Sequence, residues 1–218
     1  MKKESEKSKK ERTLRIVEAL EKKYPEAKCS LDYSDPLQLL IATRLSAQCT
    51  DARVNLVTPA LFEGYTSAED FAAADVTDIE SIIHSCGFFR AKARDIIGMC
   101  RDIIDRFGGR VPDTIEELIT LPGVGRKTAN LIVGDVYGKS AVVADTHFIR
   151  ITNLLGLTDS KDPFKVEMQM RKLLPEDKSN DFCHRCVMHG RDTCVARRPE
   201  CDSCVLKNDC HYAQNLFT

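Results

Sequence analysis

The 218-residue sequence contains no apolar run that approaches the roughly 20 consecutive residues needed to cross a bilayer. Its first residues, MKKESEKSKKERTLR, are charged and contain no apolar segment, which argues against a secretory signal. We therefore expect a cytoplasmic protein with no membrane partner, associated with the nucleoid if the source is bacterial.

An excess of charge of one sign is also lacking: the net charge is −1 and by itself predicts no nucleic-acid partner. The distribution of charge is uneven, however. Residues 1–28 carry ten Lys or Arg against six Glu, residues 121–150 carry four against two acidic residues, and residues 54–89 carry no Lys or Arg. A protein that binds a polyanion would present the basic segments and turn the acidic one away. Solvated helix faces explain the charges equally well.

Patterns typical of strands are nearly absent. Apolar residues recur at helical spacing in residues 11–23 and 93–107. Three sites have the pattern of a helix N-cap, namely Asp35 before Pro36, Thr77 and Thr114. The nearest approach to a strand, residues 140–143, is too short and isolated to build a sheet. The sequence therefore predicts an all-α fold.

A glycine turn, LPGVG, joins two predicted helices at residues 121–125. Glycine allows positive φ and a close approach of the backbone to another surface. The amides that begin the second helix, with the positive end of the helix dipole behind them, form an anion site. This helix-hairpin-helix pattern predicts that Gly123, Val124, Gly125 and Arg126 contact a DNA backbone without base preference. The alternative is ordinary packing of two helices.

Several motifs together resemble the endonuclease III branch of the helix-hairpin-helix DNA glycosylases over about residues 30–210: LPGVGRKTAN, VVADTHFIRITNLLGL, LSAQCTD, GFFRAKA and HGRDTCVARRPEC. The resemblance implies two helical lobes with a DNA cleft between them. A six-helix barrel would occupy 29–139 and contain the helix-hairpin-helix at about 114–136, and an iron–sulfur cluster lobe would combine 1–28 with 140–218.

The activity implied by this resemblance is that of a bifunctional DNA glycosylase and abasic-site lyase. Such an enzyme excises oxidised pyrimidines from damaged double-stranded DNA in base excision repair, and we expect it to act as a monomer. Three alternatives are an adenine-mismatch glycosylase, a monofunctional glycosylase for mismatched or alkylated bases, and a non-catalytic DNA-binding module. The last gives no reason for Lys127 and Asp145 to occur together.

Lys127 is the predicted nucleophile, in the first turn of the second hairpin helix. The helix dipole disfavours a cation there, and we expect partial burial to favour the neutral, nucleophilic amine further. The resemblance implies attack on C1′ of the damaged nucleotide, a Schiff base with the opened sugar, and strand cleavage by β-elimination. The alternative role is pairing with a phosphate.

Asp145 lies eighteen residues further on, where the family has its catalytic aspartate. Its carboxylate would stabilise the positive charge that develops on the sugar. It also precedes an apolar helical run and would make an N-cap, and the two roles are compatible. For His147 we expect a structural or phosphate-contacting role.

Excision requires the target nucleotide to leave the base stack, which costs a few kcal/mol. The resemblance implies that Gln48, in LSAQCTD, enters the gap. It also implies that Phe88, in GFFRAKA, wedges beside the orphaned base, for which an aromatic ring is chemically apt. The alternative for Phe88 is a core position next to Phe89.

Ten cysteines in a chain without a secretory signal argue against structural disulfides. Four of them have the spacing of the family's [4Fe–4S] cluster: Cys194-x6-Cys201-x2-Cys204-x5-Cys210. The alternative is a four-cysteine zinc site. We interpret the cluster as a scaffold that presents Arg197 and Arg198 to phosphate.

An additional C-x2-C pair, Cys183 and Cys186, departs from the family pattern just upstream of the cluster motif. These thiols would offer alternative cluster ligands or a second metal site. We expect them instead to be small apolar residues on a buried helix face.

Overall fold

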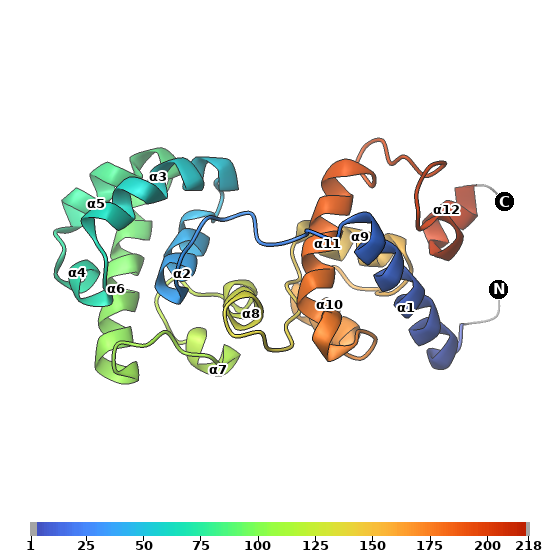
Figure 1. Ribbon diagram of the computed structural model, residues 1–218, viewed down its shortest axis with the longest axis horizontal. Coiled ribbons are helices and arrows are strands. Elements are labelled where there is room, and N and C mark those ends of the chain that lie inside the picture. Colours follow the sequence, from blue (N-terminus) through green and yellow to red (C-terminus); the bar gives the residue numbers. More distant parts are fainter. Residues whose placement is uncertain (1–3, 217–218) are drawn as a thin grey trace. The chain divides into compact units, whose positions relative to one another are not determined.

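The computed structural model describes residues 4–216, and its ordered elements are all helices (Figure 1). The prediction of an all-α fold is confirmed: these residues include no strand, and the segment 140–143 is extended chain between helices. Across the described chain, no helix is both long enough and apolar enough to span a membrane.

The chain divides into two compact units, Cys29–Gly138 and Met1–Lys28 with Lys139–Thr218. The first contains α2 (Pro36–Leu45), α3 (Asp51–Gly64), α4 (Ala68–Ala73), α5 (Val76–Ile83), η1 (His84–Cys86), α6 (Phe89–Phe107), α7 (Ile115–Leu118) and α8 (Arg126–Asp135). The second contains α1 (Glu6–Lys23), α9 (Thr146–Leu154), α10 (Pro163–Arg171), η2 (Glu176–Lys178), α11 (Ser179–Asp192), η3 (Lys207–Asp209) and α12 (His211–Leu216).

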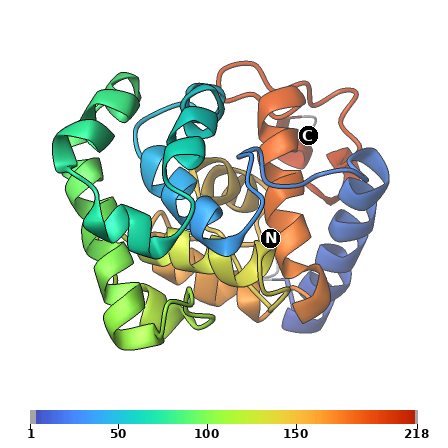
Figure 2. The same ribbon diagram turned by 60° about the vertical axis from the view of Figure 1, so that its left-hand side comes forward.

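The long helix α6 organises the Cys29–Gly138 unit (Figures 1 and 2). It packs against α4, α5 and α2, and α8 packs against α2 and α7. The apolar repeat that predicted this helix is its buried face, where Ile96, Met99 and Ile103 have no solvent exposure. Burial of such side chains contributes roughly 1.5–3 kcal/mol each. This rigid helix fixes the loops at both of its ends.

Local capping chemistry sets where several helices begin. Asp35 accepts the N–H of Gln38 and Thr114 accepts that of Glu117, so these two N-cap predictions are confirmed. The capping box predicted at Thr77 is wrong. Helix α5 begins at Val76, because Asp75 caps it by accepting the N–H of Thr77. A stronger capping residue two positions earlier therefore decides the start of this helix.

In the other unit, α11 is central and packs against α9 and α1. The Phe148 and Phe182 rings meet edge to face at 6.0 Å between centroids. Cys183 and Cys186 lie on the buried face of α11, as predicted, with at most 2% of their surface exposed. Burial raises the pKa of the Cys186 thiol well above its usual value, so it stays protonated.

Candidate functional site

The turn between α7 and α8 has the geometry of a backbone anion site. Gly123 has a φ of +72°, and a Cβ there would lie 2.6 Å from Nε of Arg44, so only glycine fits. Val124 is buried beneath the turn, whereas Gly123 and Gly125 are exposed. Gly125 is the N-cap of α8 and provides no side-chain hydrogen bond. The first amides of α8 therefore have no side-chain cap, an arrangement suited to phosphate.

Lys127 is the second residue of α8 and is exposed to solvent. The expected partial burial is wrong, because the buried stretch of this helix begins only at Ala129. Its position in the first turn of α8, as predicted, remains. Arg126, which opens the helix, is half-buried. The turn thus presents one exposed amine beside its backbone anion site.

Asp145 caps α9, and this prediction is confirmed. Its Oδ1 accepts the N–H of Phe148 at 2.7 Å. The chain before it is buried, and the N–H of Val143 donates to Sγ of Cys183 at 3.3 Å. The carboxylate is therefore oriented by the N–H of Phe148, on a backbone whose preceding residues are buried, and it remains partly accessible. His147 is half-buried, and its Nδ1 has no hydrogen-bond partner within residues 4–216.

Gln48 and Phe88 lie on exposed loops of the Cys29–Gly138 unit. Two-thirds of the surface of Phe88 is exposed (66%), so the alternative of a core position is wrong. Phe89 packs instead, with its ring 4.5 Å from that of His84. Gln48 and Phe88 both have positive φ, 54° and 48°. Such conformations cost a non-glycine residue about 1–2 kcal/mol and concentrate at functional sites.

Sequence reasoning missed two polar contacts that support these loops. Nζ of Lys92 donates to the carbonyl oxygens of Leu45 at 2.7 Å and of Cys86 at 2.9 Å. Asp95, three residues further along α6, accepts from Nε of Arg44 at 2.7 Å. The available signal was a lysine in phase with the apolar face of α6. Its partners, however, lie 47 and 6 residues away along the chain.

The four predicted ligand cysteines lie around one cavity, whose other walls are largely apolar: Cys194, Cys201, Cys204 and Cys210. All four are half-buried and form no disulfide. Burial raises the thiol pKa of Cys194, Cys201 and Cys204. Nowhere in the described chain do three or more His, Cys, Asp or Glu side chains converge closely enough to hold a single metal ion.

Two side chains missed by the sequence analysis contact these sulfurs. Nη1 of Arg150 lies 3.6 Å from Sγ of Cys194 and donates to that residue's carbonyl oxygen at 2.7 Å. Nε2 of His189 lies 3.7 Å from Sγ of Cys204. Burial lowers the pKa of His189 to about 4, so the imidazole is neutral. Two of the four sulfurs, those of Cys194 and Cys204, thus each have one polar side chain beside them.

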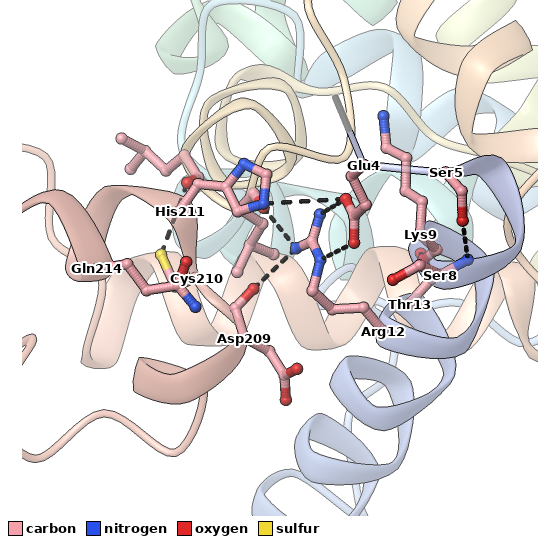
Figure 3. A network of polar contacts seen from close by, with 12 residues as sticks. Glu4, Ser5, Ser8, Lys9, Arg12, Thr13, Asp209, Cys210, His211 and Gln214 are labelled. Carbon is pink, nitrogen blue, oxygen red and sulfur yellow. Dashed lines mark hydrogen bonds and ion pairs between the residues drawn. The ribbon is translucent and has the colours of Figure 1, made fainter. Parts of the chain in front are cut away.

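The N-terminal helix secures the segment before the last of these cysteines (Figure 3). Nη1 of Arg12 donates to the carbonyl oxygens of Leu155 at 2.7 Å and of Asp209 at 2.8 Å. Its Nε and Nη2 donate to the two carboxylate oxygens of Glu4 at 2.9 and 2.8 Å. Arg12 is 5% exposed. Hydrogen bonds to a buried charged group are worth about 1.5–3 kcal/mol, so this network fixes Cys210 in place.

The loop between Cys194 and Cys201 is closed by the N–H of Glu200, which donates to the carbonyl oxygen of Thr193 at 3.0 Å. Arg197 and Arg198 are exposed on this loop. Their exposure leaves both guanidinium groups accessible from solvent.

Known proteins match this chain over most of its length. A family described as HhH-GPD superfamily base excision DNA repair protein matches residues 41–176. The endonuclease III of Synechocystis sp. is 50% identical over 208 residues, covering 95% of each chain. A solved structure of a trapped endonuclease III–DNA covalent intermediate is 39% identical, with a TM-score of 0.88 over 96% of this chain and 99% of that one.

The chain belongs to the endonuclease III family, within the HhH-GPD superfamily of base excision DNA repair proteins. It is accordingly a DNA glycosylase and abasic-site lyase that acts on oxidised pyrimidines, and the function predicted from the sequence is confirmed. The family membership accounts for the hairpin turn, since a repair enzyme must hold DNA by its backbone before it reads a lesion.

Proposed function

We propose that Lys127 is the nucleophile of this glycosylase and lyase. The observation that carries the proposal is its exposed position directly after the uncapped glycine turn, where a bound phosphate and the amine would meet the same strand. The trapped covalent intermediate of a similar endonuclease III with DNA supports an enzyme-bound step. The exposed amine is accessible to a nucleotide held at the turn, and lysine amines form Schiff bases with carbonyl groups.

In the proposed reaction, the Nζ lone pair of Lys127 attacks C1′ of the damaged nucleotide. The bond from C1′ to the base breaks, and the base leaves with its electron pair and takes a proton. Opening of the sugar ring gives a Schiff base between Nζ and C1′. Loss of a proton from C2′ then expels the 3′ phosphate by β-elimination and cuts the strand.

Asp145 is the proposed partner of this reaction. Its carboxylate would stabilise the positive charge that develops on the sugar and accept a proton from the attacking amine. The hydrogen bond from the N–H of Phe148 fixes the carboxylate in advance, so no reorganisation is needed at the moment of reaction.

Contacts to damaged double-stranded DNA are proposed at three places. Gly123, Val124, Gly125 and Arg126 would hold one phosphate; His147, Arg197 and Arg198 would hold others. Gln48 would enter the gap left by the extruded nucleotide, and the exposed ring of Phe88 would wedge beside the orphaned base. The estranged adenine in the similar endonuclease III–DNA complex supports such an extrusion. We expect the enzyme to act as a cytoplasmic monomer, associated with the nucleoid if the source is bacterial.

The four cysteines around the cavity fit a [4Fe–4S] cluster better than a zinc ion. Four thiols with otherwise apolar walls form a soft donor set. The wide spacing at both ends of the motif, Cys194-x6-Cys201 and Cys204-x5-Cys210, favours the cluster over a four-cysteine zinc site. The N–H of Leu206, 3.4 Å from Sγ of Cys204, and Arg150 would stabilise thiolates. The cluster would crosslink the loop that carries Arg197 and Arg198.

Replacement of Lys127 by Ala tests the nucleophile, with Arg126→Ala as the matched control one residue away. We expect Lys127→Ala to bind a thymine glycol duplex with nearly unchanged affinity and to lose strand cleavage. Arg126→Ala should bind more weakly and still cleave when the enzyme is in excess. Retained cleavage by Lys127→Ala would overturn the assignment.

A further inference from the structure

Lys92 occupies an unusual position for a lysine, because none of its surface is exposed. It lies on the apolar face of α6, in line with Ile96, Met99 and Ile103. A polar group in such surroundings costs free energy unless it is hydrogen-bonded. Burial accordingly lowers the pKa of Lys92, although the thiols of Cys49 and Cys86 oppose this shift. A buried lysine that is retained at this cost calls for a specific role.

The two acceptors of Lys92 are the ends of two different segments. Leu45 is the last residue of α2, three residues before Gln48, and Cys86 is the last residue of η1, two residues before Phe88. Each carbonyl lies at the end of its helix and has no helical N–H as donor, so each needs a donor from elsewhere. One Nζ supplies both donors, at 2.7 and 2.9 Å. The two exposed loops are thereby fixed to a common atom.

Backbone strain at both loops requires this kind of support. Gln48 and Phe88 are the only non-glycine residues in the described chain with positive φ. Strained conformations persist only where the surrounding structure over-determines them. The hydrogen bonds of Lys92 hold the carbonyl groups three residues before Gln48 and two residues before Phe88.

The same face of α6 also contacts the hairpin turn. Asp95, about one helical turn after Lys92, pairs with Arg44, with Oδ2 2.6 Å from Nη2. That pair packs so closely under Gly123 that a Cβ there would lie 2.8 Å from Asp95 Oδ2. Helix α6 thus sets both loops and the anion-binding turn within one compact unit.

We propose that Lys92 is a positioning residue for nucleotide extrusion: through Leu45 and Cys86 it fixes the spacing of Gln48 and Phe88, so that both side chains enter the duplex together. The proposal rests on the roles proposed above for Gln48 and Phe88. A simply structural lysine would contribute to stability alone. A positioning lysine also affects extrusion of the damaged nucleotide, the step in which Phe88 takes part.

A double-mutant cycle between Lys92→Met and Phe88→Ala tests this. Methionine keeps the length and the apolar stem of lysine and removes both donors. Single-turnover excision of thymine glycol should fall roughly ten- to a hundredfold in Lys92→Met, since small misplacements have effects of that size. Cleavage at a preformed abasic site should fall by only about threefold, because no base must be unstacked. In the Phe88→Ala background, Lys92→Met should have a much smaller effect.

Ile103→Ala provides the matched control. Ile103 is equally buried on α6, about 16 Å further along the helix from Lys92, and its truncation destabilises by about 2–5 kcal/mol. We expect it to lower the Tm and leave excision per folded enzyme within about twofold, as for a change remote from the loops. Should Lys92→Met not fold, Lys92→Gln, whose amide donates two hydrogen bonds, takes its place and should retain more excision than any donor-free variant.

The outcomes separate the two proposals. If Phe88→Ala and Gln48→Ala both excise normally, the extrusion roles are wrong, and the role of Lys92 fails with them. If Phe88→Ala is impaired and Lys92→Met has the same effect in both backgrounds, or has no more effect than Ile103→Ala at equal stability, only the positioning role of Lys92 is overturned.

Discussion

Gln48 and Phe88, forty residues apart in the chain, have the same rare backbone conformation, with φ values of 54° and 48°. Both side chains are exposed, and each follows a carbonyl group that Lys92 holds. Neither side chain gains packing from its strained backbone. A strained and exposed pair of this kind is expected where a protein inserts residues into a partner.

Phe88→Gly should separate stability from activity. Relief of about 1–2 kcal/mol of strain offsets the entropy cost of glycine, about 0.5–1 kcal/mol. Thermal unfolding should therefore show an unchanged or higher Tm, while single-turnover excision falls about tenfold for want of the wedge. Phe89→Ala, at the packed neighbouring ring, should lower the Tm instead. A lower Tm with normal excision in Phe88→Gly would contradict this account.

Two substitutions of Asp145 should separate its role as a helix cap from its role in base excision. Asn is as good an N-cap as Asp but has no charge, whereas Ala removes the cap at a cost of about 1 kcal/mol. We expect Asp145→Asn to keep the wild-type Tm and to lose most base excision. Asp145→Ala should lower the Tm and also lose most base excision. Equal excision by Asp145→Asn and the wild type would show that the residue is a cap only.

The cysteine assignment predicts that a cluster ligand and a buried cysteine of the same unit differ in their effect on iron content. Purified wild-type protein should contain about four irons per chain. Cys201→Ser should lower the iron content and the Tm. Cys186→Ser, on the buried face of α11, should keep the iron. Iron content and visible absorption of the three proteins are the measurement. Iron loss in Cys186→Ser at normal stability, or one zinc per chain in the wild type, would overturn the assignment.

Acid should weaken the Arg12 network in a defined pH range. The hydrogen bond from Arg12 lowers the pKa of Glu4 below its usual value of 4.5. A depressed carboxyl pKa stabilises the fold fully above the unfolded value, and the contribution is lost as the pH falls through the folded value. The Tm difference between wild type and Glu4→Gln should therefore be constant above about pH 5.5 and vanish at low pH. Glu6→Gln, exposed two residues later at the start of α1, should show no such trend.

Much of the fold could be predicted because its determinants are local. Asp35, Thr114 and Asp145 cap their helices through an N–H three residues away, which a sequence pattern captures. Thr77 failed for an equally local reason, competition from Asp75. The cysteine and glycine spacings are likewise read directly from the sequence.

The remainder depends on packing between distant segments. The sequence does not reveal the hydrogen-bond partners of Lys92, because these are carbonyl groups of α2 and η1 that only folding brings close to it. The exposure of Lys127 depends on where the core reaches α8, and residue type does not reveal this. The positive φ angles of Gln48 and Phe88 likewise could not be predicted from the sequence, since neither residue type prefers this conformation.

The most direct test of the account is borohydride trapping on a duplex with one thymine glycol, followed by peptide mapping of the adduct. Borohydride reduces a Schiff base to a stable amine, which marks the lysine that formed it. We predict one covalent adduct with the wild type, located at Lys127, and none with Lys127→Ala. An adduct at another lysine, or no adduct on this duplex and on one with an abasic site, would contradict the central claim.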